Sequence, residues 1–338
     1  MTGCRKYVSL AQLRHIVTSW EPARQLATVI ARPQFTPVVE RQHVLELPAG
    51  RRLSYASFGD GSGPVVIVLD GPGSRGLARA AAPAAAELGL RLVAPDRPGF
   101  AASTPVAGYA IADWPRDHGA LLDALGVRRA GILAQSGGTP YALAAAAALP
   151  DRTTGVALMA PVGPLDEPAM LATSGARVRR GALLARRAPW LLRLALAAAG
   201  RQARRNPERA ATKVAADLPE ADAAIMRDPS NWELHKRTTA EILSRPDAVA
   251  REIGRLARPW GVDYGAISAP VALWSGDRDD VHPTAHARRL AELLHGAPVH
   301  VVPDAGTFGL MPRYGEALAF AAGRQTPRGG GAGTSGPT

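Results

Sequence analysis

A serine in a turn of small residues is the clearest candidate for chemistry in this sequence. Residues 134–138 read AQSGG and stand between an apolar run at 130–134 and a helical stretch at 138–148. A sharp strand-to-helix turn strains the backbone of its central serine and needs small residues two places before and after it. Such a turn predicts Ser136 as an exposed nucleophile, with the Gly137 N–H near any oxyanion that forms. The alternative is an ordinary turn whose serine caps the following helix.

The elements that must hold this serine alternate along the chain. Residues 43–47 and 52–58 alternate in polarity like a β-hairpin. Short runs that are apolar at nearly every position suit strands buried on both faces of a parallel sheet. We expect such strands at 65–69, 90–94, 130–134, 155–160, 270–274 and 299–302, separated by helices at 75–88, 111–125, 138–148, 284–295 and 313–323. The sequence therefore predicts an α/β fold with a mostly parallel sheet flanked by helices.

One long stretch carries no strand pattern. Residues 166–263 are rich in Ala, Leu and Arg and are broken by prolines at 189, 207, 219, 229, 246 and 259. This composition predicts a helical cap, inserted between two strands of a core made of residues 37–165 and 264–323 and lying over the ends of the sheet, where ligands bind in such folds. Residues 1–36 are expected to form an N-terminal extension, and the Gly-rich residues 324–338 a disordered tail.

Several loops resemble those of the α/β-hydrolase superfamily, in its group of esterases, lipases and iminopeptidase-like enzymes. Residues 70–73, DGPG, are similar to the family's His-Gly-x-Pro-Gly loop, and residues 96–103, DRPGFAAS, resemble a second family loop. The resemblance covers about residues 37–323 and implies that Gly71 supplies an oxyanion N–H together with Gly137. The family's His-Gly pair is replaced by Leu69 and Asp70. A carboxylate there would oppose developing negative charge, so we expect Asp70 to point away and cap a turn.

The same resemblance places the other members of a catalytic triad. Residues 275–283, SGDRDDVHP, are similar to the family's G-x-x-D-x-x-V-P loop, which implies that Asp279 is the triad acid. A solvated acidic loop is the alternative. Residues 303–308, PDAGTF, are similar to the family's P-x-A-G-H-F loop, so Thr307 stands at the position of the catalytic histidine. A threonine hydroxyl cannot accept and return a proton near neutral pH as an imidazole does.

Another histidine could replace the missing base. His282 is the best placed, because it follows Asp279 by three residues in a loop at the same end of the sheet as Ser136. A loop histidine without a role in proton transfer is the alternative interpretation of His282. The remaining seven are expected within elements, in the cap or far from the serine: His15, His43, His118, His235, His286, His295 and His300.

Composition limits the partners. The chain has 338 residues, an apolar fraction of 46%, a single cysteine and a net charge of +11. One cysteine excludes an internal disulfide framework. No apolar run reaches 18 residues and the N-terminus lacks a secretory pattern, so we expect a cytoplasmic protein with no membrane span. The basic stretch 177–209 hints at an anionic substrate. No nucleic-acid motif accompanies it, so we expect a small-molecule substrate, no nucleic acid and no cofactor, and the sequence leaves the oligomeric state open.

Two functions remain. The first is a serine hydrolase of a small ester, amide or related acyl substrate, with Ser136 as nucleophile, Gly71 and Gly137 at the oxyanion and Asp279 orienting His282 or another histidine. The second is a catalytically impaired or inactive homologue that binds a ligand or partner, because Thr307 replaces the usual histidine.

Overall fold

The computed structural model describes residues 39–59, 62–216 and 218–324. The expected N-terminal extension, residues 1–36, lies outside the described residues, as does the expected tail beyond residue 324. The sheet and its covering helices fall within the described ranges.

Within these ranges eight strands form one sheet, in the spatial order β1-β2-β4-β3-β5-β6-β7-β8. Only β2 runs opposite to the other strands. The mostly parallel sheet and the leading hairpin expected from the sequence are therefore confirmed. The strands are β1 (Arg41–Leu47), β2 (Arg51–Phe58), β3 (Val65–Leu69), β4 (Arg91–Pro95), β5 (Ala130–Ser136), β6 (Thr153–Pro161), β7 (Val271–Gly276) and β8 (Val299–Val302).

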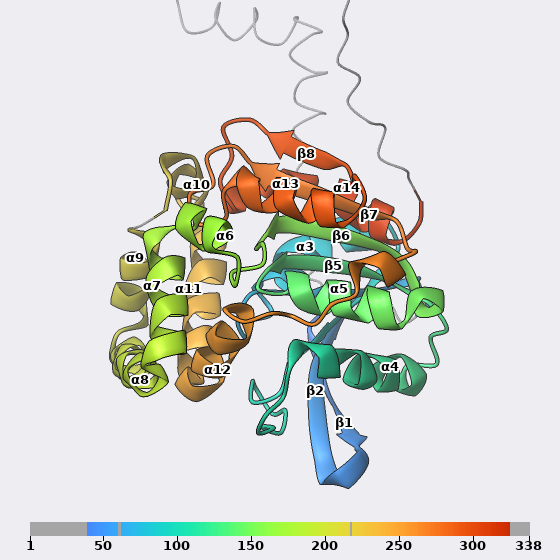
Figure 1. The fold of residues 1–338 in the computed structure, drawn as a ribbon, viewed down its shortest axis with the longest axis horizontal. Coiled ribbons are helices and arrows are strands. Elements are labelled where there is room, and N and C mark those ends of the chain that lie inside the picture. Colours follow the sequence, from blue (N-terminus) through green and yellow to red (C-terminus); the bar gives the residue numbers. More distant parts are fainter. Residues whose placement is uncertain (1–38, 60–61, 217, 325–338) are drawn as a thin grey trace, which may run out of the picture. The chain divides into compact units, whose positions relative to one another are not determined.

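Helices cover both faces of the sheet (Figure 1). Successive side chains of a strand point to opposite faces, so Ile67 and Leu69 join one hydrophobic core while Val66 and Val68 join the other. All five residues of β3 are buried, which explains why the strand is apolar at every position. The first core includes α4 (Trp114–Ala124), α5 (Thr139–Ala148) and α13 (Thr284–Leu293), and the second includes α3 (Gly76–Glu87) and α14 (Tyr314–Ala321).

Between β6 and β7 the described chain forms helices and no strand, and we call this segment, residues 166–263, the helical insert. Five of the seven helices that the structure describes in it begin at a proline. Proline suits the first position of a helix, where a backbone N–H would have no partner within the helix. The prolines that interrupt the sequence pattern therefore also start new helices. The helices are α6 (Pro168–Thr173), α7 (Ala176–Arg187), α8 (Pro189–Arg205), α9 (Pro207–Ala215), α10 (Glu220–Ile225), α11 (Pro229–Ser244) and α12 (Pro246–Leu256).

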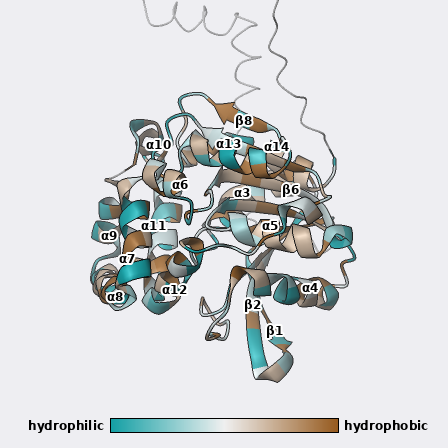
Figure 2. Ribbon diagram, viewed as in Figure 1, coloured by the Kyte–Doolittle hydropathy of each residue, from teal (hydrophilic) through white to brown (hydrophobic). Residues whose placement is uncertain are grey.

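Hydropathy distinguishes the helical insert from the sheet. Figure 2 shows hydrophilic and hydrophobic residues mixed along the helices of the insert. This mixture is typical of helices with one face packed and the other in water.

No helix in the described part of the chain has both the length and the apolar character that crossing a membrane requires.

Candidate active site

Ser136 lies in a sharp turn between β5 and α5. Its φ angle is +51°, in the left-handed region that residues other than glycine rarely adopt. A Cβ atom at Gly138 would overlap the carbonyl oxygen of Leu69, so only glycine fits two places after the serine. Ala134, two places before it, is completely buried. The small residues around Ser136 therefore allow the strained backbone that projects its side chain from the end of the sheet.

His282 lies against this serine. Its Nε2 is 2.9 Å from Ser136 Oγ, a hydrogen bond between side chains 146 positions apart. His282 comes from the loop between β7 and α13 and is only 7% exposed. Burial lowers the pKa of His282 to about 4, so its imidazole is neutral near pH 7. A neutral ring that carries its proton on Nδ1 can accept the serine proton at Nε2.

Asp279 holds the backbone of the histidine loop and does not contact the imidazole through a hydrogen bond. Its Oδ1 accepts the backbone N–H groups of Val281 (2.9 Å) and His282 (2.8 Å). The buried Nδ1 of His282 has no hydrogen-bond partner among the described residues. The hydrogen bond between carboxylate and imidazole that we expected for Asp279 is thus not formed, and the carboxylate instead accepts hydrogen bonds from the main chain. Burial raises the pKa of Asp279 above its usual range.

Thr307 forms a hydrogen bond with the second oxygen of the Asp279 carboxylate. Its hydroxyl donates a 2.6 Å hydrogen bond to Asp279 Oδ2. Thr307 thus makes the contact with the acid that an imidazole at this position would make. The structure brings together Ser136 and His282 as one pair and Asp279 and Thr307 as a second, with the loop backbone joining the two.

Asp222 of α10 fixes the Thr307 loop from the helical insert. Its Oδ1 accepts hydrogen bonds from the backbone N–H groups of Phe308 (3.0 Å) and Gly309 (2.9 Å). Asp222 is buried, with 1% of its surface exposed. Burial raises the pKa of Asp222. The sequence analysis missed this residue, because nothing in an acidic position of an Ala-rich helix indicates a partner 86 residues away.

The two glycines expected at the oxyanion lie beside the serine. A Cβ atom at Gly71 would be 3.8 Å from Ser136 Oγ, and one at Gly137 would be 3.8 Å from the Cα of Gly71. The Gly71 N–H, however, donates to Asp70 Oδ1 at 2.7 Å. Asp70 Oδ2 accepts the N–H of Leu77 at 3.0 Å in the first turn of α3 and also the Ser74 hydroxyl. Asp70 therefore accepts a hydrogen bond from the first turn of α3, but it does not point away from the serine as we expected, because it also lines the cavity at Ser136 and accepts the Gly71 N–H.

A buried ion pair holds the loop of Gly71 in place. Arg97 donates from Nη2 to the carbonyl oxygen of Gly71 (2.9 Å) and from Nε to Glu252 Oε1 (2.7 Å). Glu252, which belongs to α12, also accepts the Tyr141 hydroxyl at 2.8 Å. These contacts link the loop of Gly71, the helix after Ser136 and the helical insert. Arg97 falls in the family-like loop 96–103, whereas no sequence signal marked Glu252.

A cavity of about 240 Å³, the serine cavity, opens above Ser136 and His282. Asp70, Gly71 and Thr307 also line it, whereas Asp279 and Gly137 do not. Most of the remaining wall is apolar and comes from the helical insert and from α3: Leu77, Ala80, Val214, Leu218, Met226, Leu234 and Ile242.

The other described histidines have partners or positions that separate them from Ser136. His235 lines the serine cavity, but its Nε2 faces the Ala211 carbonyl oxygen at 3.2 Å. His286 is buried on α13 and accepts the Gly163 N–H at Nδ1. His118 is buried on α4, His43 stacks on Tyr55, His300 stacks on Trp274 and His295 is exposed. His15 lies outside the described residues.

Comparison with known proteins gives one family match. The model of a family described as "alpha/beta hydrolase fold" matches residues 63–314. No curated protein is similar enough to be matched.

Solved structures give many matches at low identity. A hydrolase from Pseudomonas aeruginosa is 20% identical with a TM-score of 0.61, over 84% of this chain and 98% of that one. A thermophilic esterase from Thermogutta terrifontis is 22% identical with a TM-score of 0.57, over 82% and 96%. An enol-lactonase from Burkholderia xenovorans is 21% identical with a TM-score of 0.58, over 82% and 96%. At identities this low, the likeness shows that the fold is shared and nothing beyond the fold.

Proposed function

We propose that this chain, which belongs to the α/β hydrolase family, is a serine hydrolase that cleaves a small ester, amide or related acyl substrate. The observation that carries the proposal is the 2.9 Å contact between Ser136 Oγ and His282 Nε2 at a strained strand-to-helix turn. An activated nucleophile needs a base within hydrogen-bond reach, and this pair meets that requirement.

The proposed reaction runs through an acyl-enzyme. Ser136 Oγ attacks the acyl carbonyl carbon while His282 Nε2 takes the hydroxyl proton. The Gly137 N–H stabilises the resulting oxyanion. The intermediate collapses, and His282 returns the proton to the departing alcohol or amine. A water then attacks the acyl group and gives its proton to His282, the acid leaves, and the proton returns to Ser136.

Two features would make this reaction slower than that of a complete triad. The imidazolium that forms on His282 has no carboxylate hydrogen-bonded to its ring, and burial disfavours its charge. The Gly71 N–H is engaged by Asp70, so it must be released before it can donate to the oxyanion.

The serine cavity supports a substrate with an apolar acyl group. Its volume of about 240 Å³ and its aliphatic wall suit a short hydrocarbon chain, with the helical insert acting as the cap over the sheet end. The solved esterase and enol-lactonase that the fold resembles act, by their names, on ester bonds. We therefore favour an ester or lactone over an amide.

Turnover of p-nitrophenyl esters with acyl chains of graded length tests the proposal. The parent protein should hydrolyse short- to medium-chain esters, and Ser136→Ala should abolish this activity. Ser268→Ala is the control, because Ser268 is an exposed serine that does not line the serine cavity. If the Ser136→Ala protein still hydrolyses these esters at the parent rate, the proposal is wrong.

A second candidate function is binding without turnover. It is favoured by one observation, the Asp70 carboxylate that accepts the Gly71 N–H where an oxyanion should accept it. In that case the serine cavity holds an apolar ligand, and neither the parent nor Ser136→Ala hydrolyses any ester. Binding of a fatty acid to the folded parent protein, without ester turnover, would select this candidate over the first.

A further inference from the structure

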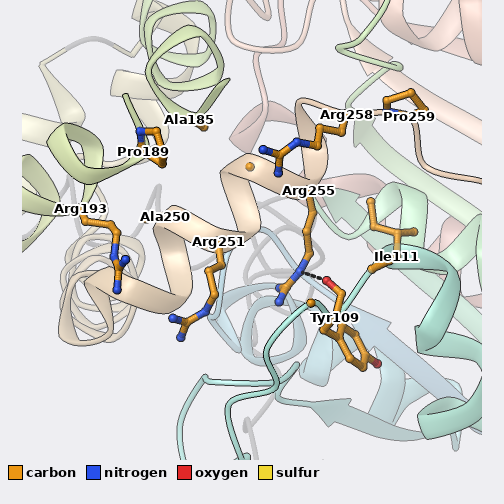
Figure 3. Close-up of a pocket in the computed structure, with 13 residues that line it drawn as sticks. Tyr109, Ile111, Ala185, Pro189, Arg193, Ala250, Arg251, Arg255, Arg258 and Pro259 are labelled. Atoms are coloured by element: carbon orange, nitrogen blue, oxygen red, sulfur yellow. Dashed lines mark hydrogen bonds between the residues drawn. The ribbon is translucent and has the colours of Figure 1, made fainter. Parts of the chain in front are cut away.

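A second cavity lies between the start of α8, the outer side of α12 and the loop around Tyr109 (Figure 3). We call it the arginine cavity. It measures about 410 Å³ and shares no lining residue with the serine cavity. Helix α12 contacts the turn at Ser136 on one side, since Leu256 would be 3.1 Å from a Cβ atom at Gly137, and its neighbouring residue Arg255 lines the arginine cavity. The volume falls within the range of about 300–1,000 Å³ that small-molecule sites occupy.

Four arginines and no carboxylate line the arginine cavity. Arg251, Arg255 and Arg258 follow one another at spacings of four and three, which places them on one face of α12 and of the turn that continues it. Arg193 comes from α8. Figure 3 shows these side chains reaching the cavity from two sides, with Arg255 fixed by a 2.8 Å bond from Nε to the carbonyl oxygen of Tyr109.

Carboxylates neutralise only part of this charge. Arg193 donates to Asp247 in an exposed pair at 2.9 Å. Arg255 donates to Glu252 at 3.0 Å, but Glu252 also pairs with Arg97.

The other two arginines, Arg251 and Arg258, add charge that no described residue neutralises. The side chains of Arg251 and Arg258 form no hydrogen bond or ion pair with any residue that the structure describes. Arg97, Arg193 and Arg255 therefore pair with two carboxylates, and no carboxylate of the described residues balances Arg251 or Arg258.

Helix stabilisation alone does not explain the arrangement. Cations are favoured at the C-terminal end of a helix, which accounts for Arg255 and Arg258 near the end of α12. The effect is confined to the last turn, so it accounts neither for Arg251 nor for Arg193, which belongs to another helix. These two side chains nevertheless line the same cavity.

The rest of the wall is apolar. Tyr109, Ile111, Ala185, Pro189 and Ala250 all line it. A guanidinium group matches the geometry of a phosphate group and binds it through two parallel hydrogen bonds. We propose that the arginine cavity binds an organic phosphate, with the phosphate held by Arg251 and Arg258 and the carbon part against the apolar wall.

The phosphate can belong to a soluble ester or to a lipid headgroup. Next to Pro189 and Arg193, the first turns of α8 expose Trp190 (67%) and Leu194 (55%). Exposed Trp and Leu beside arginines are typical of helices that bind the interface of anionic membranes. The two sources share the phosphate chemistry, and they differ in whether Trp190 and Leu194 take part.

The experiment measures binding of two probes to the Ser136→Ala protein, so that its outcome does not depend on hydrolysis. The soluble probe is phenyl phosphate, followed by calorimetry at physiological ionic strength. The membrane probe is a vesicle of phosphatidylcholine, with or without phosphatidylglycerol, followed by co-sedimentation. The test variant is Arg251→Ala/Arg258→Ala. The control is Arg128→Ala/Arg288→Ala, which removes the same charge from exposed positions outside the helical insert.

The proposal expects at least one probe to bind, and the test variant to weaken that binding by roughly tenfold or more, since charged hydrogen bonds are lost. The control should keep the parent affinity. A lipid source is indicated if Trp190→Ala/Leu194→Ala weakens vesicle binding alone, and a soluble source if it changes neither probe. If neither probe binds, or if test and control variants weaken binding equally, the proposal is wrong. Arg251→Gln/Arg258→Gln repeats the test should the alanine variant not fold.

Discussion

The acid limb of the pH–rate profile should lie near pH 4. The base must be neutral to accept the serine proton, and burial lowers the pKa of His282 to about 4. At pH 5 an imidazole of ordinary pKa would be only about 3% neutral, whereas a group with a pKa of about 4 is about 90% neutral. The kcat/KM at pH 5 should therefore stay within about twofold of its value at pH 8, instead of falling about thirtyfold.

The assay is kcat/KM for a short acyl ester between pH 4 and pH 8, with the released acid quantified by chromatography. This readout does not depend on a reporter that itself titrates. Tryptophan fluorescence at each pH checks that the protein stays folded. His235→Gln should leave the acid limb unchanged, because His235 lines the same cavity but bonds to Ala211. A limb centred near pH 6.5 in the folded protein would refute the assignment of a buried, unpaired imidazole as base.

Three substitutions test the neighbouring groups. Asp279→Asn should lower kcat/KM by no more than about tenfold, against about 10⁴-fold where an acid orients the base through its ring; a loss of the larger size would mean that Asp279 does contact the imidazole during turnover. Thr307→His in a His282→Ala background should raise kcat/KM at least about tenfold over His282→Ala, because it places an imidazole beside Asp279, and an unchanged rate would count against this geometry. Asp222→Ala should lower the free energy of unfolding in denaturant by about 2–4 kcal/mol, since two loop N–H groups lose their acceptor, and Asp222→Asn by about 1 kcal/mol; equal losses would contradict the hydrogen-bond argument.

The sheet could be predicted because its signal is local. Each strand buried on both faces, such as β3, reads as a continuous apolar run, and each helix that follows carries its own pattern. The spatial order of the strands has no such signal in composition, and the sequence analysis made no prediction of it. In the helical insert the prolines marked boundaries correctly, but the packing of its helices depends on contacts between distant residues.

In the candidate site, too, local features could be predicted from the sequence and contacts between distant residues could not. The turn at Ser136 could be read from the sequence, because its small residues are adjacent to one another and serve one local conformation. The sequence could not show whether His282 lies close enough to Ser136 to act as its base, because this depends on how two loops meet at the end of the sheet. The contacts of Asp222 with the Thr307 loop and of Glu252 with Arg97 join residues 86 or more positions apart, and no local pattern encodes them.

The most direct test of the central claim, that His282 activates Ser136, is labelling of the purified protein by a fluorophosphonate probe. The parent should label and Ser136→Ala should not. His282→Ala should label at least about 100-fold more slowly, as expected for loss of a general base, while His235→Gln should label at the parent rate. A folded parent that does not label, or a His282→Ala protein that labels as fast as the parent, would contradict the claim.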